Sequence, residues 1–412
     1  MRGTMATKQS ILMLGGSRQQ VVAIETARRL GYRTVLCDYL DDNPGQYAAD
    51  VFYRESTTDR EAMLAVARKE HVAGVLAYAS DPAAVTAAYV AENMGLPTNP
   101  PCSVETLSEK HLFRAHLKHA GLPCPVALPV AVGESPESVI ARSREAHMRY
   151  PVVLKPTDSS GSKGVTIIEQ PDTTHFEAAL AHAARFSRNQ VLVLEEYIEA
   201  GFPHVIGGDI FVVDGKVRFW GLMSCFRNEA LGGLVPIGKR NPSGLSKGQE
   251  HAVKRVLQQL VSSLGLRFGE LNLEVIMGRD DKPYVIELGA RAGGNMIPVQ
   301  LSDISGIDLV EANVRYAMGD EGLDVRFEGS DAPYATYVLH AERDGVFDGV
   351  DIAPIMEQHI YRRVMYSNPG DAAECFDGAN KALGIFFMRF DTTEQMEDLM
   401  AHVTQNIRVR VR

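Results

Sequence analysis

The chain has few cysteines and no long apolar run, and both shortages narrow its class. The five cysteines are scattered along 412 residues without a Cys-x-x-Cys pair, at positions 37, 102, 124, 225 and 375. We therefore expect neither a disulfide framework nor a zinc site. No apolar run approaches the roughly 20 residues that span a bilayer, and residues 1–9 lack the apolar stretch of a secretion signal. The protein is expected to be cytoplasmic and to have no membrane partner.

An excess of positive charge is also missing. The formal net charge at pH 7 is -10, whereas nonspecific nucleic-acid binding needs a basic face. We expect no nucleic-acid partner, although a local basic groove is compatible with this charge. Hydrophobic residues at 45% and charged residues at 23% are typical of a globular protein. The length favours about two to three domains.

Strands and helices alternate through the first hundred residues. Six segments carry this pattern, with strands at 11–14, 34–37 and 74–78 and helices at 20–30, 58–70 and 81–94. Such alternation predicts a parallel sheet with right-handed crossovers. The expected fold class is therefore α/β, and prolines near residue 100 mark the edge of this unit.

A loop rich in glycine and serine at 155–164 separates two predicted strands, 151–154 and 165–169. Its small residues leave backbone N–H groups free to approach an anion, and Lys155 and Lys163 add positive charge. Lys155 also ends an apolar run, where an unpaired ammonium group is costly. We interpret the loop as a lid that closes over a phosphate. An ordinary polar hairpin turn is the alternative.

The remaining segments predict a mixed α+β arrangement. Helices are expected at 108–119, 174–186, 247–264, 309–318 and 393–402, and strands at 191–195, 209–213, 217–223, 337–340, 360–365 and 385–390. Residues 225–245 form a predicted loop that is long for a compact domain, and long ordered loops are often functional. Arg227 in this loop and His204 before it are candidates for substrate recognition. Ordinary polar loop residues are the alternative.

Two carboxylates and an arginine lie on two neighbouring predicted strands joined by a polar turn. Side chains alternate along a strand, so Glu270, Asn272 and Glu274 share one face of the first strand. Glu287 and Arg291 share a face of the second. A hairpin would bring the acids of one strand near the acid and the arginine of the other. This combination suits a divalent metal ion that carries a phosphate.

Three other motifs fit nucleotide or metal sites less well. The run 233–240 nearly matches Gly-x-x-x-x-Gly-Lys-[Ser/Thr], but Arg240 replaces the hydroxyl group that would bind Mg²⁺. The glycine turn at 15–17, followed by Asp38, lacks the third glycine of a dinucleotide motif, and we assign it to substrate contact instead. Three histidines, at 111, 116 and 119, share a helix without metal-binding spacing and predict a solvated face.

Taken in order, these parts resemble the ATP-grasp superfamily. The matching parts are the glycine turn at 14–16, Ser108-Glu109-Lys110, Lys155 with its loop, the acidic run 195–199, Glu274, and Glu287 to Arg291. The resemblance covers residues 9–318 well. It implies a Rossmann-like parallel sheet at 1–107 and an ATP-grasp domain at 108–318, with a small α+β lid at about 123–196. Residues 319–412 would form a C-terminal α+β cap.

The resemblance also implies a role for each matching residue. Glu274 and Glu287 would bind the metal, and Arg291 and Lys155 would be catalytic. ATP would be contacted by Lys110, Lys155, Ser159, Ser160, Gly161, Ser162, Gly164, Glu195, Glu196, Tyr197, Ile198, Glu199, His204 and Leu273. In that set, residues 196–198 would form the adenine hinge and Glu199 would hold the ribose. The substrates would be contacted by Gly16, Arg227, Gly294 and Asn295.

One position departs from the family pattern. Many members carry Asn two residues after the second acid, as a further metal ligand, and here that position is Gly289. The metal would then use water, substrate or Asn272 on the facing strand. Mg²⁺ tolerates such a site because it often keeps several waters. The expected cofactors are ATP and Mg²⁺, with Mn²⁺ as a substitute.

The segment Glu-Leu-Gly-Ala-Arg-Ala-Gly-Gly-Asn-Met-Ile-Pro from residue 287 resembles the amino-acid ligases that form dipeptides or related amides. This implies a carboxylate–amine ligase that acts through an acyl phosphate and releases ADP and phosphate. Its partners would be a small acid, an amine and a second copy of the chain in a homodimer. A carboxylase that acts through carboxyphosphate is the alternative. A nucleotide-binding sensor without chemistry is a third possibility.

Overall fold

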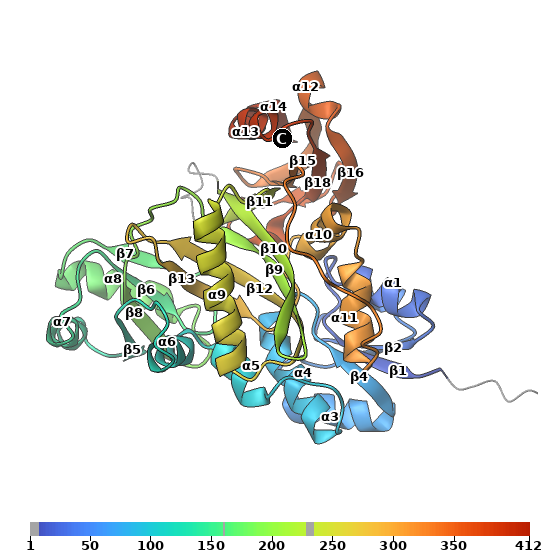
Figure 1. The fold of residues 1–412 in the computed structure, drawn as a ribbon, viewed down its shortest axis with the longest axis horizontal. Helices are drawn as coiled ribbons and strands as arrows, with labels where there is room; N and C mark the ends of the chain where they lie inside the picture. Colours follow the sequence, from blue (N-terminus) through green and yellow to red (C-terminus); the bar gives the residue numbers. More distant parts are fainter. Residues whose placement is uncertain (1–7, 160, 228–234) are drawn as a thin grey trace, which may run out of the picture.

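One large antiparallel sheet lies beside an N-terminal region and a small unit, and a C-terminal region extends it (Figure 1). The computed structural model describes residues 8–159, 161–227 and 235–412. In Figure 1 the N-terminal region is blue, the small unit that follows it is green, and the C-terminal region is red at the top. No helix in the described ranges is both long enough and apolar enough to cross a membrane.

The N-terminal region is a four-stranded parallel sheet in the order β3-β2-β1-β4, as the alternation predicts. Its elements are β1 (Ser10–Leu14), α1 (Val21–Arg29), β2 (Arg33–Asp38), α2 (Pro44–Ala48), β3 (Val51–Arg54), α3 (Arg60–Lys69), β4 (Val72–Leu76), α4 (Asp81–Asn93) and α5 (Pro101–Ser108). All five residues of β1 are buried. This is expected of a parallel strand whose two faces are both covered. The sequence pattern missed β3 and α2.

The small unit is a four-stranded antiparallel sheet in the order β5-β8-β6-β7. Its elements are α6 (Lys110–His119), β5 (Ala127–Ala131), α7 (Pro136–Glu145), β6 (Val152–Pro156), β7 (Thr166–Ile168), α8 (Thr173–Ala184) and β8 (Val191–Glu196). Phe176 of α8 packs with Leu154 and Leu194 in its core. The helix predicted from residue 108 begins at Lys110, because Glu109 has an extended backbone and separates it from α5.

The large sheet has eight strands in the order β13-β12-β9-β10-β11-β14-β18-β16. Its first half comes from β9 (Ile206–Val213), β10 (Lys216–Arg227), β11 (Pro236–Asn241), α9 (Lys247–Ser263), β12 (Phe268–Met277), β13 (Pro283–Gly289), α10 (Ile297–Ser305) and α11 (Leu309–Ala317). Helix α9 packs on one face, against Leu271, Leu273 and Val275 of β12. The alternating residues Glu270, Asn272 and Glu274 therefore face the other side.

The long loop predicted at 225–245 is wrong at both ends. Strand β10 continues to Arg227, and β11 occupies residues 236–241. β11 is almost wholly buried because it pairs with β10 on one side and β14 on the other. Residues 228–234, which include the start of the Gly-x-x-x-x-Gly-Lys-like run, lie outside the described residues. The rest of that run is strand, so the rejection of a phosphate loop there is consistent with the fold.

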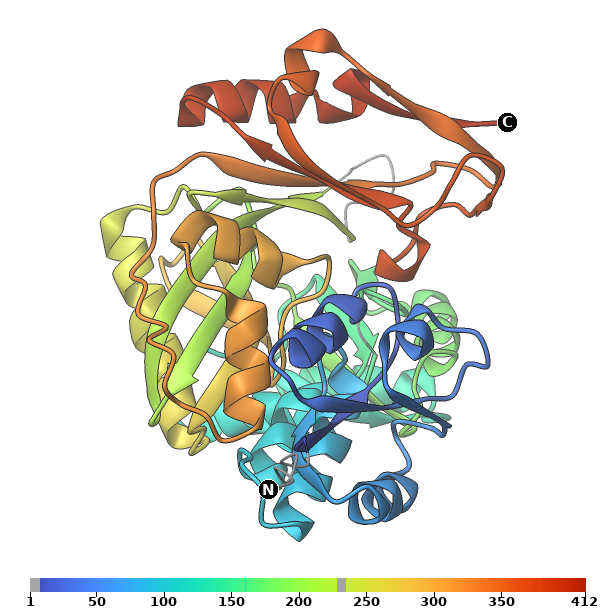
Figure 2. The same ribbon diagram turned by 90° about the vertical axis from the view of Figure 1, so that its right-hand side faces the viewer.

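The C-terminal region completes the large sheet and adds a small second one, visible above the rest in Figure 2. Its elements are β14 (Tyr334–Leu339), β15 (Gly345–Ile352), α12 (Pro354–Glu357), β16 (Ile360–Met365), β17 (Ala372–Ala373), a 3₁₀ helix (Ala379–Lys381), β18 (Gly384–Arg389), α13 (Thr393–Ala401), α14 (Val403–Asn406) and β19 (Ile407–Val411). Strands β14, β16 and β18 extend the sheet that carries the acidic hairpin. The predicted domain boundary at residue 318 stays a prediction. Strands on both sides of it belong to the same large sheet.

Candidate active site

The acidic hairpin has the predicted register. Glu274 of β12 lies directly opposite Glu287 of β13, and Asn272 lies opposite Gly289. Like charges in directly opposed positions repel. Burial is the main reason that the pKa of Glu287 is raised. The positive charge of Lys110 lowers this pKa, whereas the neighbouring carboxylates Asp81 and Glu274 raise it further. The pair is therefore a place where a bound cation would relieve repulsion.

The two acids fit a divalent metal by their donor chemistry. Mg²⁺ prefers oxygen ligands and commonly takes one or two carboxylates, with waters and substrate phosphates completing its shell. Among the residues that the structure describes, no group of three or more His, Cys, Asp or Glu side chains could hold a metal. Glu274 and Glu287 would thus supply the protein ligands, and the remaining positions would fall to water and phosphate oxygens.

Two cations on neighbouring strands stand beside Glu274. The guanidinium group of Arg227, at the end of β10, lies 3.8 Å from the Glu274 carboxylate. Lys239 of β11 is buried, and its Nζ lies 2.7 Å from Cys225 Sγ. A Cβ atom at Gly207 would fall 2.3 Å from Lys239 Nζ, so this glycine makes room for the ammonium group. The sequence indicated Arg227, but it placed Lys239 in a loop and missed it.

Arg291 is held by a residue from the N-terminal region. Its Nε and Nη2 atoms each donate to one oxygen of Asp81, at 2.7 Å and 2.7 Å. Burial opposes the charged state of both groups. The ion pair outweighs burial, so the pKa of Arg291 is raised and that of Asp81 is lowered. The sequence predicted Arg291 as a site residue and gave no indication of Asp81, the first residue of α4.

A second carboxyl pair lies deeper on the same face. Burial raises the pKa of both Asp209 and Glu270, which share a hydrogen bond. One proton shared between the two carboxyl groups accounts for this contact. Asp209 also accepts hydrogen bonds from Gly293 N at 2.8 Å and Asn272 Nδ2 at 2.7 Å. The Asn272 amide is thus bound to β9, away from β13, which disfavours the expectation that it replaces the missing metal ligand.

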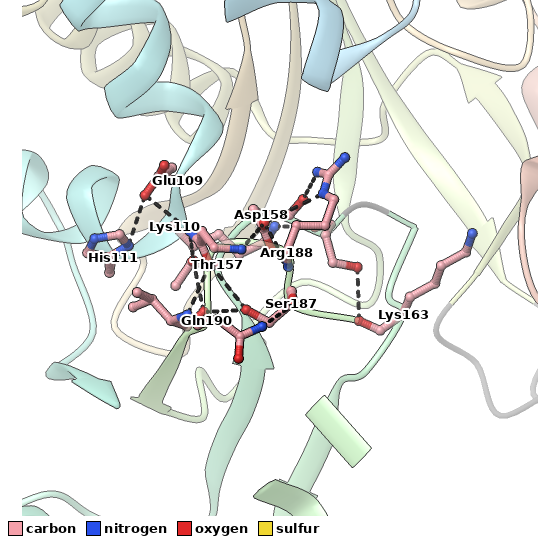
Figure 3. Close-up of polar contacts among 12 residues, drawn as sticks. Glu109, Lys110, His111, Thr157, Asp158, Lys163, Ser187, Arg188 and Gln190 are labelled. Atoms are coloured by element: carbon pink, nitrogen blue, oxygen red, sulfur yellow. Dashed lines mark hydrogen bonds and ion pairs between the residues drawn. The ribbon is translucent and has the colours of Figure 1, made fainter. Parts of the chain in front are cut away.

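The glycine-rich loop is anchored at its base (Figure 3). Asp158 accepts hydrogen bonds from the backbone N–H groups of Arg188 and Asn189, at 3.0 Å and 2.9 Å. Lys110 donates its backbone N–H to Thr157 O at 2.9 Å and its ammonium group to Ser159 O at 2.5 Å. Lys110 therefore reaches the loop that is predicted to close over a phosphate. Figure 3 shows the side chain of Lys163 extending away from these contacts.

The other predicted loop residues lie just beyond this base. Gly161 and Gly164 both have positive φ, at 69° and 74°, where glycine is favoured. Ser162 also has positive φ, and Ser159 Oγ donates to Lys163 O at 3.2 Å. Ser160 lies outside the described residues. The backbone of the loop thus has the tight turns that expose N–H groups.

Lys155 lies in a buried cluster with Glu195 and Arg114. The Lys155 ammonium group contacts the Glu195 carboxylate, which also accepts from Arg114 Nε at 2.8 Å. Burial lowers the pKa of Lys155, while Arg114 and Lys155 together outweigh burial and lower the pKa of Glu195. One carboxylate thus faces two cations. The sequence singled out Lys155 and Glu195, but Arg114 resembled an ordinary helix residue.

The predicted hinge leaves β8 toward the large sheet. The backbone N–H groups of Glu196 and Tyr197 donate to Val126 O and Pro151 O, at 2.9 Å and 3.1 Å. These two N–H groups are therefore engaged within the protein, and Ile198 is the next residue of the predicted hinge. Glu199 forms a surface ion pair with Arg279 at 2.9 Å, which a ribose hydroxyl group could replace.

Two other residues predicted to contact ATP have different surroundings. Leu273 is 1% exposed and packs in the core beneath α9, so its side chain belongs to the hydrophobic interior. His204 is half-buried and lies edge-on to Phe202, with ring centroids 5.7 Å apart. Burial and the charge of Arg240 lower the pKa of His204 to about 4. Its imidazole is therefore neutral at pH 7.

The predicted substrate residues of the N-terminal turn meet the segment after Arg291. Asn295 N donates to Gln19 Oε1 at 2.6 Å, and Gly294 lies beside the same amide. Asn295 has φ of 52°, in the left-handed region that asparagine adopts more readily than most residues. Gly16 donates its N–H to Asp38 at 2.7 Å, and a Cβ there would strike Asn43 at 2.0 Å. Asp38 thus holds the glycine turn at 15–17 through the backbone of Gly16. This role is consistent with the interpretation that the turn is not a dinucleotide site.

Residues 109–324, more than half of the chain, match the family model of the ATP-binding domain of the carbamoyl-phosphate synthase L chain. Among curated relatives, the uncharacterised protein y4rH of Sinorhizobium fredii is 25% identical over 307 residues, 72% of this chain and 60% of that protein. Carnosine synthase 1 of Homo sapiens is 25% identical over 352 residues, 77% of this chain and 40% of that protein. The chain thus spans less than two thirds of either relative.

Solved structures resemble the whole fold. The L-amino acid ligase from Bacillus licheniformis superposes with a TM-score of 0.79 at 20% identity, covering 98% of this chain and 99% of that chain. The biotin carboxylase domain of the Hydrogenobacter thermophilus 2-oxoglutarate carboxylase, solved with MgADP and bicarbonate, gives 0.73 at 18% identity over 98% and 91%. At such identities the likeness shows the fold alone. Together with the family match, it places the chain among the ATP-grasp ligases, in the family of the carbamoyl-phosphate synthase ATP-binding domain.

Proposed function

We propose that this chain is an ATP-dependent carboxylate–amine ligase that forms an amide or peptide bond and releases ADP and phosphate. The observation that carries the proposal is the end of the β12–β13 hairpin. There Glu274 and Glu287 lie opposite each other in register. Arg291, close to them in the chain, is held by Asp81 and by the Ala292 carbonyl, and two of its guanidinium N–H groups remain for a ligand. Two acids for a metal and one oriented guanidinium group suit phosphoryl transfer to a carboxylate.

The nucleotide would lie between the small unit and the large sheet. Lys155 and Lys110 would neutralise its phosphates, and the loop at 157–164 would close over them. The hinge around Ile198 would read the adenine, and Glu199 would exchange Arg279 for the ribose hydroxyl groups. A divalent metal on Glu274 and Glu287 would neutralise developing charge on the phosphate oxygens. Closure of the loop excludes water, which otherwise hydrolyses the activated acid.

The chemistry proceeds in two displacements. A substrate carboxylate oxygen attacks the γ-phosphorus of ATP, the bond to the bridging oxygen of ADP breaks, and an acyl phosphate forms. The amine then attacks the acyl carbon, phosphate leaves with the electron pair of the C–O bond, and the proton that the amine loses passes to the departing phosphate. Arg291 would stabilise both the transferred phosphate and the tetrahedral oxyanion, because its donors are fixed before the reaction begins.

The two substrates would meet near Arg227 and the segment at Gly294 and Asn295, against the turn that carries Gly16. Amino acids are the substrate class we favour, because carnosine synthase and an L-amino acid ligase are among the similar proteins. A cytoplasmic homodimer stays our expectation for the assembled enzyme.

A carboxylase that acts through carboxyphosphate is the second candidate. A specific observation favours it, namely the likeness to a biotin carboxylase domain solved with MgADP and bicarbonate. The same acids and the same arginine would serve that reaction. Bicarbonate-dependent release of ADP, without any added amino acid, would distinguish it.

The deciding experiment measures ADP release with Mg²⁺-ATP across a panel of amino acids, singly and in pairs, with bicarbonate as a separate arm. Mass spectrometry of the products identifies any amide that forms. The proposal predicts ADP release that requires both an acid and an amine, with one amide formed per ADP. Binding of ATP without turnover anywhere in the panel would instead favour a nucleotide sensor and overturn the ligase assignment.

A further inference from the structure

Gly289 occupies the position where many ATP-grasp proteins carry a metal-binding asparagine, and the space that a side chain would need is filled. A Cβ atom built there lies 2.8 Å from Asp81 Oδ1 and 3.3 Å from Arg291 Nε. The backbone of Gly289 does not have the positive φ that favours glycine. Glycine is therefore required at this position by lack of space and not by backbone conformation. The Asp81 carboxylate occupies the space that a side chain would need.

Asp81 is well placed to fix one orientation of Arg291. It is the first residue of α4, and its two oxygens accept from Nε and Nη2 at 2.7 Å each. The remaining terminal nitrogen, Nη1, donates to the carbonyl of Ala292 at 3.0 Å. Three of the five guanidinium N–H groups are thus committed, and one on each terminal nitrogen is left for a ligand. A planar bidentate pair of this kind sets direction as well as charge.

A metal-ligand role for Asp81 is the obvious alternative, because it would replace the missing asparagine. The geometry does not support it. Among the described residues, no three acidic, histidine or cysteine side chains come together as a metal site, so Asp81 does not join Glu274 and Glu287 at ligand distances. Both Asp81 oxygens are also engaged by Arg291.

We propose that Asp81 is a positioning residue for Arg291. We also propose that position 289 is glycine because the absence of a side chain leaves space for the Asp81 carboxylate. Through this contact the N-terminal region sets the orientation of the arginine that steadies the transferred phosphate. The inference rests on the proposed function for the role of Arg291. The clamp itself rests only on the contacts of Asp81, Gly289 and Arg291.

The first measurement does not need activity. Phenylglyoxal modifies accessible arginine side chains, and peptide mass spectrometry reports the rate at Arg291 alone. We expect Asp81→Ala to speed modification of Arg291 by about tenfold or more, and Gly289→Ala to do the same because its methyl group displaces the carboxylate. In the Asp81→Ala background, Gly289→Ala should add little. An unchanged rate at Arg291 in both single variants would overturn the clamp.

The second measurement uses turnover. By analogy with residues that orient metal ligands, loss of a positioning partner costs roughly 10–100-fold. We expect Asp81→Asn to lower kcat by that factor with little change in the KM for ATP, and to have no further effect in the Arg291→Ala background. Asp308→Asn is the control, because Asp308 lies just before the first residue of a helix, α11, and pairs with an arginine, Arg29, but at the exposed surface.

The two measurements distinguish failure of the Asp81 inference from failure of the proposed ligase function. Faster modification of Arg291 with unchanged kcat in Asp81→Asn would overturn the positioning role while the contact itself stands. A wild-type enzyme without turnover on any substrate would defeat the proposed function, and the modification rates would still decide the clamp. Loss of activity that tracks only a lower melting temperature, equally in Asp308→Asn, would reduce Asp81 to a structural ion pair and overturn the inference.

Discussion

Two buried ion clusters in this molecule hold cations in opposite ways. In the cluster of the small unit, the side chains of Arg114, Glu195 and Lys155 are 2%, 5% and 7% exposed, and one carboxylate faces two cations. At the hairpin, Arg291 and Asp81 are 10% and 21% exposed and balance each other. The first cluster keeps an excess of positive charge where phosphates are expected. The second is neutral and directional.

The difference also concerns where the partners originate. Glu195 and Lys155 come from the neighbouring strands β8 and β6 of the small unit, and Arg114 of α6 also donates to Ile286 O of β13 at 3.0 Å. Asp81 reaches Arg291 across 210 positions of sequence, from helix α4 of the N-terminal region. The charge that we propose attracts the nucleotide therefore lies mainly on two paired strands, whereas the orientation of Arg291 depends on the packing of the N-terminal region against the hairpin.

The largest expected effect comes from removing the single carboxylate of the first cluster. Glu195→Gln leaves two buried cations without a counter-charge, and breaking a buried ion pair in this way costs about 3–5 kcal/mol. Urea unfolding should show this loss of stability. Glu196→Gln is the control, since its partner Arg149 is 88% exposed, and it should cost less than about 1 kcal/mol. Equal effects in both variants would remove the contrast between the clusters.

A second test separates the two clusters by function. Lys155→Ala and Arg291→Ala should each lower turnover by roughly 10²–10³, by analogy with loss of an oxyanion-stabilising donor. Only Lys155→Ala should also weaken ATP binding, measured by calorimetry, because Arg291 acts on the transferred phosphate. Both variants should retain their circular dichroism spectra. Near-normal turnover in either would remove that residue from the mechanism.

A third test concerns His204, a half-buried group outside both clusters. The pKa of His204 is lowered to about 4 by burial and then by Arg240, against an ordinary value of 6.5. Between pH 6.5 and 4 the unfolded chain therefore binds a proton that the folded protein does not, and stability falls as the pH drops. His204→Gln should lose less stability over this window.

Thermal unfolding at pH 7 and pH 4.5 measures this difference. His175→Gln serves as the control, because its side chain is 78% exposed. If His204→Gln and the wild type show the same acid sensitivity, burial of this imidazole is not responsible.

The smallest expected effect is at the surface. The Glu199–Arg279 pair has side chains 61% and 75% exposed, and pairs of this kind contribute about 0–1 kcal/mol. Neither Glu199→Ala nor Arg279→Ala should change stability by more than that. The KM for ATP should rise only in Glu199→Ala, since that carboxylate is proposed to bind ribose. A rise of equal size in Arg279→Ala would contradict the assignment.

The sequence was sufficient for features that depend on local periodicity. The alternation of Glu270, Asn272 and Glu274 with apolar residues, and a short polar turn, predicted a hairpin whose acids meet. Glu274 does lie opposite Glu287. The parallel sheet and the lysine-bearing loop between β6 and β7 were predicted for the same reason, because each is defined by a short stretch of chain.

The features that the sequence did not predict depend on contacts between residues far apart in the chain. Asp81 is an acidic residue at a helix start, where such residues are common for the helix dipole alone, and nothing nearby indicates Arg291. Strand β11 contains Gly238, Lys239 and Arg240, a composition that disfavours a strand in isolation. It forms because β10 and β14 pair with it on both sides, and such context overrides propensity.

The position of β11 also has a consequence for shortened forms of the protein. Arg240 and Asn241 pair with Ala335 and Tyr334 of β14, so the sheet that bears the acidic hairpin continues into β14, β18 and β16 of the C-terminal region. Truncation ahead of β14 would turn β11 into an open edge, with backbone donors and acceptors available to any other strand. Such a fragment would contain every proposed nucleotide ligand and would still be prone to aggregate, because its sheet would end at an unprotected strand.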